Sequence, residues 1–194
     1  MHAGRVVYCR CARYPVAWAR FLLMKGINYA WHQRFRELYD KCLVKYRNEH
    51  RNVETFFTSR EVGVLRSLGA KPQELFDYAE DSSDLDSETA LLITAVRRDY
   101  FITMQKAAWS EKTIRMEDLP AKDAELGGVP WLPRIIEKAK ARLRGEMPNE
   151  LMYCCGGDRR FFRAHDIHPA DFLRFVWSAK GNEEKILAYV KGAR

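Results

Sequence analysis

Apolar residues recur along most of this chain at the three- and four-residue spacing of amphipathic α-helices. The segment from Asn28 to about Tyr46 shows this spacing most fully. Its apolar face carries Trp31, Phe35, Leu38, Tyr39 and Cys42. Comparable patterns predict further helices that begin near Pro15, Thr58, Pro72, Ser87, Leu132, Asp158, Pro169 and Asn182. Short runs at 6–8, 53–57 and 151–153 are instead typical of strands or extended links. The pattern therefore predicts a mainly α fold.

Capping and breaking residues set the predicted helix boundaries. The side chains of Thr58 or Ser59, Ser87 and Asn182 can accept hydrogen bonds from first-turn N–H groups. Gly145 suits the end of a helix, because glycine readily adopts the left-handed conformation found there. In the helix after Ser87, a row of residues at four-residue spacing is expected to face the core: Leu92, Val96, Tyr100 and Met104.

A loss of periodicity between two helical stretches divides the chain. Residues 1–13 are predicted to form an N-terminal arm, and residues 14–106 a first helical half. Residues 107–126 are predicted to be a linker, since the helical pattern stops there and proline intrudes. Two adjacent glycines that favour a flexible turn then open the second helical half, 127–194.

The two halves share a weak internal similarity. Three pairs of identical residues align when the chain is shifted by 97 positions: Asn52 with Asn149, Arg66 with Arg163, and Pro72 with Pro169. Each half then reads as a long helix, an extended link, a short helix, a proline-started helix and a closing helix. We interpret the fold as one compact helical domain with two pseudo-repeated halves. Chance similarity stays the alternative, because few positions are identical.

Composition and charge favour a soluble, cytoplasmic protein. No run approaches the roughly eighteen apolar residues of a membrane span, and no signal-peptide pattern precedes the first helix. The five cysteines, an odd number, fit reduced thiols better than a disulfide framework. The formal net charge of +7 permits attraction to anions, although 26 acidic residues indicate a mixed surface.

The segment from Tyr153 to Phe162 carries the densest candidate chemistry. Cys155 and Asp158 stand three residues apart across two glycines, near arginines and a predicted helix start. A cysteine in such surroundings can be an activated nucleophile, with His165 or His168 as a candidate base. The alternative is a small buried cysteine beside an aspartate that caps the helix.

Aromatic and basic residues of the second half form a candidate site for an anionic ligand. Its predicted members are Trp131, Arg134, Lys138, Arg159 and Arg160. A basic stripe on the outer side of the helix after Leu132 can also hold phosphates, through Arg134, Lys138, Lys140, Arg142 and Arg144. Nucleic-acid binding is the weaker interpretation, because the proline-started helices offer mainly acidic residues where bases would be read. A solvated helix face is the alternative to both.

No metal site and no cofactor is expected. The C-x-C pair Cys9 and Cys11 and the adjacent pair Cys154 and Cys155 do not fit the spacing of structural zinc ligands. P-loop, dinucleotide-binding, zinc-protease and hydrolase motifs do not occur in the sequence.

Three spaced motifs of the second half agree in order with a known pattern. They are Leu126-Gly127-Gly128, Trp131–Ala139, and Tyr153-x-Cys155-x-x-Asp158-Arg159-Arg160-Phe161-Phe162. On these motifs, residues 120–192 resemble an uncharacterised bacterial family, domain of unknown function 5069. Members of that family usually have proline after the motif cysteine, where this chain has Gly156, and this departure is expected to loosen the turn. The resemblance implies no activity, because none is established for the family.

The sequence thus favours a non-catalytic helical module that binds a small anionic ligand or a partner, with a homo-oligomer as an accompanying expectation. The first alternative is a small-molecule enzyme whose nucleophile is Cys155. Nucleic-acid binding through the basic helix face is the weaker alternative, and no association with a membrane is expected.

Overall fold

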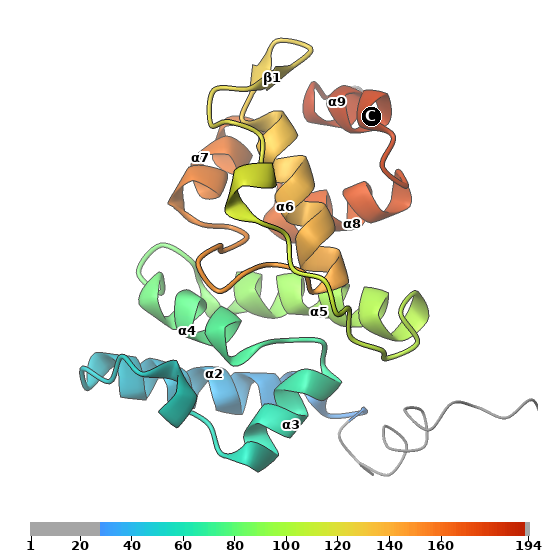
Figure 1. The fold of residues 1–194 in the computed structure, drawn as a ribbon. Helices are drawn as coiled ribbons and strands as arrows, with labels where there is room; N and C mark the ends of the chain where they lie inside the picture. The colour runs from blue at the N-terminus through green and yellow to red at the C-terminus, as the bar shows by residue number, and fades with distance from the viewer. Residues whose placement is uncertain (1–27, 193–194) are drawn as a thin grey trace, which may run out of the picture.

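The computed structural model describes residues 28–192, which form a mainly helical fold as predicted. Eight α-helices, α2 to α9, and a two-stranded hairpin lie in this part of the chain. Figure 1 shows three tiers, with α2 and α3 at one end, α4 and α5 in the middle, and α6 to α9 at the other end. None of the helices within 28–192 combines the length and apolar character needed to cross a bilayer.

Some predictions fall outside the described residues. They are the N-terminal arm 1–13, the helix expected after Pro15, and the thiols of Cys9 and Cys11. The helix expected from Asn28 begins at Trp31, after a short turn.

The first tier depends on the apolar face of α2 (Trp31–Arg47). Its buried residues are those that the spacing predicts: Phe35, Leu38, Tyr39 and Cys42. This face packs mainly against α4 (Pro72–Glu80) and also contacts α5 (Ser87–Thr103). The helical periodicity of α2 therefore identified its core side correctly.

The link from α2 to α3 (Ser59–Ser67) differs from the prediction. Residues 53–57 were expected to be extended, but Val53–Thr55 forms a 3-10 helix, η1. The Asn52 side chain accepts a hydrogen bond from the Glu54 N–H and starts this turn. Thr58 and Glu61 then form a capping box at the beginning of α3.

The central helix, α5, is contacted by α2 on one side and by α6 and α8 on the other. The predicted core row is therefore wrong in part, because Leu92 is 37% exposed and Met104 is 56% exposed. The buried residues instead occupy two sides of α5: Ala90, Leu91, Ile93, Thr94, Val96, Arg97 and Phe101. The cap is also shifted by one residue, since Asp86 rather than Ser87 accepts the N–H of Thr89.

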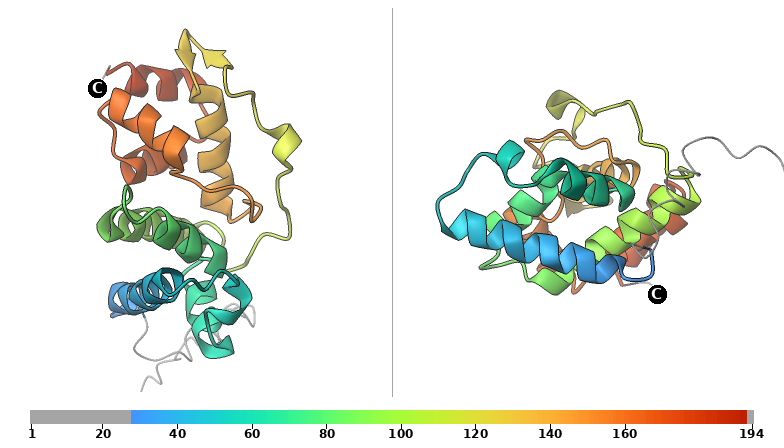
Figure 2. Two further views of the ribbon diagram at one scale, coloured as in Figure 1. Left: turned by 90° about the vertical axis from the view of Figure 1, so that its left-hand side faces the viewer. Right: turned by 90° about the horizontal axis from the view of Figure 1, so that it is seen from below.

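The predicted linker runs along one side of the molecule from α5 to a hairpin, as Figure 2 shows. It contains a 3-10 helix, η2 (Met116–Asp118), and ends in strand β1 (Glu125–Leu126), which pairs with strand β2 (Val129–Pro130) just beyond the linker. The Gly127-Gly128 turn has positive φ at both residues, 57° and 78°, as a tight two-residue hairpin requires. The turn expected to be flexible is therefore a defined hairpin.

The last tier consists of α6 (Leu132–Arg144), α7 (Gly156–Ala164), α8 (Pro169–Ser178) and α9 (Glu183–Val190). Two predicted boundaries are confirmed: Gly145 ends α6 in the left-handed conformation, and the Asn182 side chain caps α9. Figure 1 shows α6 crossing above α5, with α7 and α8 beside it.

The same order of elements occurs on both sides of the linker. Residues 31–103 contain α2, η1, α3, α4 and α5, and residues 132–190 contain α6, a link, α7, α8 and α9. One hydrophobic core runs through both sets, because α5 packs directly on α6 and α8. The division into halves and their origin by duplication stay predictions.

We predict that the junction of α2 and α3 weakens in acid through Glu61. Hydrogen bonds from the Lys41 ammonium and the Thr58 N–H lower the pKa of Glu61 from 4.5 to about 2. Because the folded-state pKa lies below the unfolded value, this stabilisation is complete above the unfolded pKa and is lost as the pH falls toward the folded one. Glu61→Gln should lower the free energy of unfolding by about 1 kcal/mol at neutral pH.

Urea denaturation across a series of pH values measures this effect. The difference between the wild type and Glu61→Gln should shrink as the pH falls from about 5 to about 2. Glu37→Gln is the matched control, because Glu37 pairs with Arg34 on the exposed side of α2. A difference that stays constant over this range would contradict the assignment.

Candidate functional site

Trp131 lies at the junction between the hairpin and α6. As the residue before the helix it has φ = 68°, in the left-handed region, and its indole ring turns toward α7. A Cβ at Gly157 would approach the ring to 2.7 Å. Glycine is therefore required at 157, because the indole already occupies the space beside it.

The helix α7 begins earlier than predicted. Its N-cap is Cys155, and Asp158 is the third residue of the first turn rather than the residue that opens the helix. Cys154 precedes it with φ = 71°, which turns its N–H toward the Asp158 carboxylate at 2.9 Å. Asp158 thus fixes the turn before α7 instead of capping the helix itself.

The buried carboxylate of Asp158 is the centre of a group that we call the Asp158 cluster: Trp131, Lys138, Cys154, Cys155 and Asp158. Asp158 is 0% exposed and accepts hydrogen bonds from the Trp131 indole N–H at 3.0 Å and the Cys154 N–H. It also forms an ion pair with Lys138, whose side chain is 2% exposed. Three donors, one of which is the oppositely charged Lys138, make the burial of both ions tolerable.

The two adjacent thiols differ in environment. Cys154 is fully buried, and burial raises the pKa of its thiol to about 12, with the nearby Asp158 charge adding to the effect. Cys155 is partly exposed, and its Sγ accepts a hydrogen bond from the Lys138 ammonium at 3.3 Å. Cys154 is therefore held as a neutral thiol, and Cys155 is the accessible member of the pair.

The structure does not bring the candidate bases to Cys155. His165 caps the opposite end of α7, roughly 15 Å along the helix axis from Cys155, and packs against Phe161. His168 is the N-cap of α8, where its Nδ1 accepts a hydrogen bond from the Ala170 N–H. Both histidines therefore have local structural roles at helix ends.

The cations predicted to bind a ligand are largely engaged within the protein. Lys138 is paired with Asp158, and the buried guanidinium of Arg159 pairs with Asp81 at 2.7 Å and with Asp84 at 2.9 Å. Arg134 donates to the carbonyl of Pro120 at 2.7 Å. Arg160 follows Arg159 in the sequence and is exposed, and it does not belong to the Asp158 cluster.

The basic stripe predicted on the outside of α6 is interrupted. Lys138 and Arg142 are each 1% exposed, because α6 is covered on more than one side by the rest of the fold. Arg142 forms an ion pair with Glu74 of α4 and donates to the Tyr78 hydroxyl at 3.3 Å. The prediction of a continuous solvated basic face is therefore wrong.

The acidic partners of these cations were not recognised in the sequence. Asp81 and Asp84 belong to a stretch that indicates only a loop, and Glu74 indicates only a favourable first turn of a helix. One feature of the sequence could have indicated these ion pairs: this loop has an excess of acidic residues, and the segment after Leu132 has an excess of basic residues. Within residues 28–192, no cluster of three or more His, Cys, Asp or Glu side chains is placed to hold a metal ion.

Comparison with known proteins finds a similarity for the segment that contains the Asp158 cluster. Residues 117–194 match the model of the family described as Domain of unknown function (DUF5069). This match confirms the resemblance seen in the second half. No curated protein and no solved structure matches the chain. The match includes all of the Asp158 cluster, whereas the acidic partners on α4 and in the loop after it lie outside the matched segment.

We predict that the Lys138–Asp158 pair is a structural requirement. Lys138→Met leaves a buried carboxylate without its counter-ion and should lower the free energy of unfolding by about 3–5 kcal/mol. Lys138→Met combined with Asp158→Asn removes both charges and should lose less than the two single changes added together. Urea unfolding followed by circular dichroism measures the stability of Lys138→Met, of Asp158→Asn and of the double variant.

The control is Lys140→Met on the same helix, where Lys140 pairs with the more exposed Glu137. This change should cost less than about 1 kcal/mol. Equal losses for Lys138→Met and Lys140→Met would show that the buried pair has no special importance.

Proposed function

We propose that this chain is a non-catalytic helical module that binds a small anionic ligand or a partner. The closed bonding of the Asp158 cluster carries the proposal. Asp158 already accepts three hydrogen bonds, and Lys138 and Trp131 are two of the donors. Groups that satisfy one another in this way stabilise a fold, and they are not left free to move a proton or to polarise a substrate.

The charge of the molecule supports an anionic ligand over a cationic one. The formal net charge is +7, which attracts anions over a distance comparable to the Debye length. An anion beside the Asp158 cluster would meet Arg134 and Arg160 rather than Lys138, because Lys138 is neutralised. The net charge therefore favours an anionic ligand, and this ligand can contact cations other than Lys138 of the Asp158 cluster.

We further propose a cytoplasmic, bacterial protein that forms a homo-oligomer and arose by internal duplication. The free thiols of Cys42, Cys154 and Cys155 fit a reducing compartment. The family resemblance supports a bacterial origin, and the shared order of elements supports a duplication. The exposed apolar side chains of Leu92 on α5 and Met104 directly after it are compatible with contact between copies.

A small-molecule enzyme with Cys155 as nucleophile is the second candidate. One observation favours it: the Lys138 ammonium lies 3.3 Å from the Cys155 sulfur, at the beginning of α7. A positive charge and a helix N-terminus both stabilise a thiolate. Against it stand the distance to His165 and the engagement of Asp158, which leave neither residue positioned as a base.

Nucleic-acid binding remains the weakest candidate. It requires a row of exposed cations along α6, and the burial of Lys138 and Arg142 argues against such a row. Arg134, Lys140 and Arg144 are the members that stay at least partly exposed.

The thiol of Cys155 distinguishes the first two candidates. We predict that iodoacetamide alkylates Cys155 of the folded protein at neutral pH no faster than it alkylates N-acetylcysteine. A catalytic thiolate should react faster by on the order of tenfold or more. Peptide mapping by mass spectrometry gives the rate for each cysteine, and Cys42 and Cys154 serve as buried references in the same sample.

Cys155→Ser is the matched variant, and it should keep the wild-type melting temperature within a few degrees. Rapid alkylation that disappears in Cys155→Ser would replace the proposed function by the enzyme hypothesis.

A further inference from the structure

The first half carries an open groove that no sequence motif indicated. It has a volume of about 530 Å³ and lies where η1, the end of α3 and the beginning of α4 meet the linker. Its charged lining residues are Arg51, Arg66, Lys71 and Glu54. A volume of this size is typical of sites for small molecules. Three cations face one acid, so the groove has a positive potential.

These three cations differ from those of the second half in their partners. Among the ion pairs formed within residues 28–192, none involves Arg51, Arg66 or Lys71. Arg51 donates to the carbonyls of Tyr46 and His50, and Lys71 donates to the carbonyl of Met147 at 2.7 Å. Neutral carbonyls hold the side chains of Arg51 and Lys71 in place without cancelling their charge. The groove therefore keeps ordered positive charge that an anion can use.

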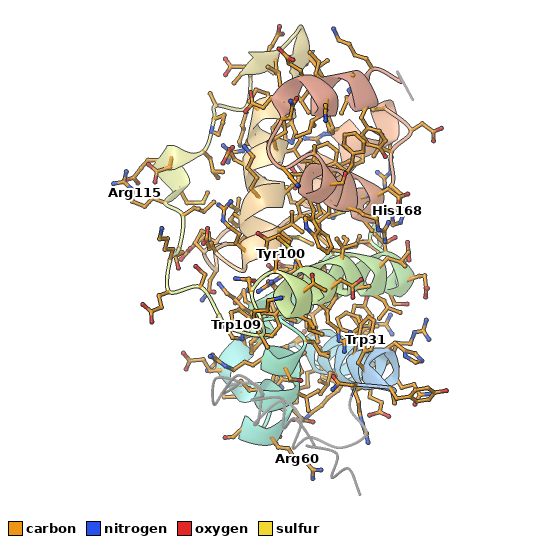
Figure 3. The ribbon with its side chains drawn as sticks, turned by 90° about the vertical axis from the view of Figure 1, so that its right-hand side faces the viewer. Trp31, Arg60, Tyr100, Trp109, Arg115 and His168 are labelled. Carbon is orange, nitrogen blue, oxygen red and sulfur yellow. The ribbon has the colours of Figure 1, made fainter. Side chains whose placement is uncertain are left out.

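Trp109 provides an aromatic wall beside these charges. Its indole N–H donates to the carbonyl of Arg66 at 3.2 Å, and the Arg66 guanidinium lies 5.3 Å from the ring. Figure 3 shows Trp109 at the boundary between α3 and α5. The fully buried guanidinium of Arg97 lies 5.4 Å from the same ring and forms no ion pair within the described part of the chain. Two guanidinium groups thus surround a fixed ring at the groove wall.

The remaining lining is suited to an organic anion rather than to a bare ion. The side chains of Val53, Val62, Ala70 and Pro72 give apolar surface, and Asn52, Gln73 and Asn149 give amide groups. Pro72 and Gln73 are the first residues of α4, whose positive dipole end therefore faces the groove. A ligand with a flat apolar part and a phosphate or carboxylate group would match each of these surfaces.

We propose that this groove binds a small organic anion that carries a flat ring and a phosphate or carboxylate group. The proposal deepens the proposed function and rests on it for the non-catalytic role, while it moves the ligand site from the Asp158 cluster to the first half. Arg51, Arg66 and Lys71 would contact the anionic group, and Trp109 would contact the ring. All of the lining residues except Asn149 lie outside the segment matched by the family, so this site belongs mainly to the additional part of the chain.

Isothermal titration calorimetry with naphthyl phosphate tests the groove, with naphthol and inorganic phosphate as probes for each part alone. Naphthyl phosphate should bind more tightly than either part. Arg51→Ala combined with Arg66→Ala should weaken it by at least about tenfold, because two charge-assisted hydrogen bonds are lost. Both arginines are exposed, so this variant should keep its fold. The melting temperature of the double variant shows whether it is folded.

Arg60→Ala is the matched control. Arg60 lies on the same helix, is exposed and does not line the groove, and Figure 3 shows it at the end of α3 away from Trp109. It should leave the affinity within about twofold, since a distant exposed charge is screened. An equal loss in Arg60→Ala would overturn the groove as the site, because general attraction would then explain binding.

The same titration separates the two proposals. Binding that survives Arg51→Ala with Arg66→Ala but is lost in Arg134→Ala with Arg160→Ala would overturn the groove and leave the binding function in place. An absence of binding by naphthyl phosphate at low ionic strength would also overturn the groove. The non-catalytic role itself fails only if Cys155 proves to be an activated thiol.

Discussion

A carboxylate and an ammonium that share a dry interior determine how α6 and α7 meet. Neither Asp158 nor Lys138 can be buried alone, because an unpaired ion in such a place is strongly destabilising. The rest of the junction follows from their pairing. The Trp131 indole must lie beside Gly157 to reach the carboxylate, and Cys154 must adopt a positive φ to offer its N–H.

Ion pairs also join the tiers of the molecule to one another. Arg142 and Arg159, which belong to the second half, find their counter-ions in Glu74, Asp81 and Asp84 of the first. Around η1 and α4, Arg51, Arg66 and Lys71 form no ion pair within the described part of the chain. The uneven charge of the groove is therefore linked to the way the two sets of helices are joined.

The sequence predicted the local features well and the long-range ones poorly. Periodicity found the buried side of α2, and the residues at Gly145 and Asn182 marked helix ends, because these signals depend on neighbours a few positions away. It misjudged α5 because this helix is covered on two sides, which no single apolar row reveals. In the candidate site, spacing grouped Lys138 with the exposed cations, since its partner lies 20 residues further along the chain.

The two adjacent glycines at the beginning of α7 differ in the space available for a side chain. At Gly157 a side chain would overlap the indole of Trp131, whereas at Gly156 the nearest atom to an added Cβ is 3.7 Å away. Gly156 is the first residue of its helix, the position where proline is best tolerated. A side chain at 156, proline included, would thus meet no close contact through its Cβ. A larger residue at 156 therefore fits the present backbone, while a larger residue at 157 requires a smaller or displaced side chain at 131.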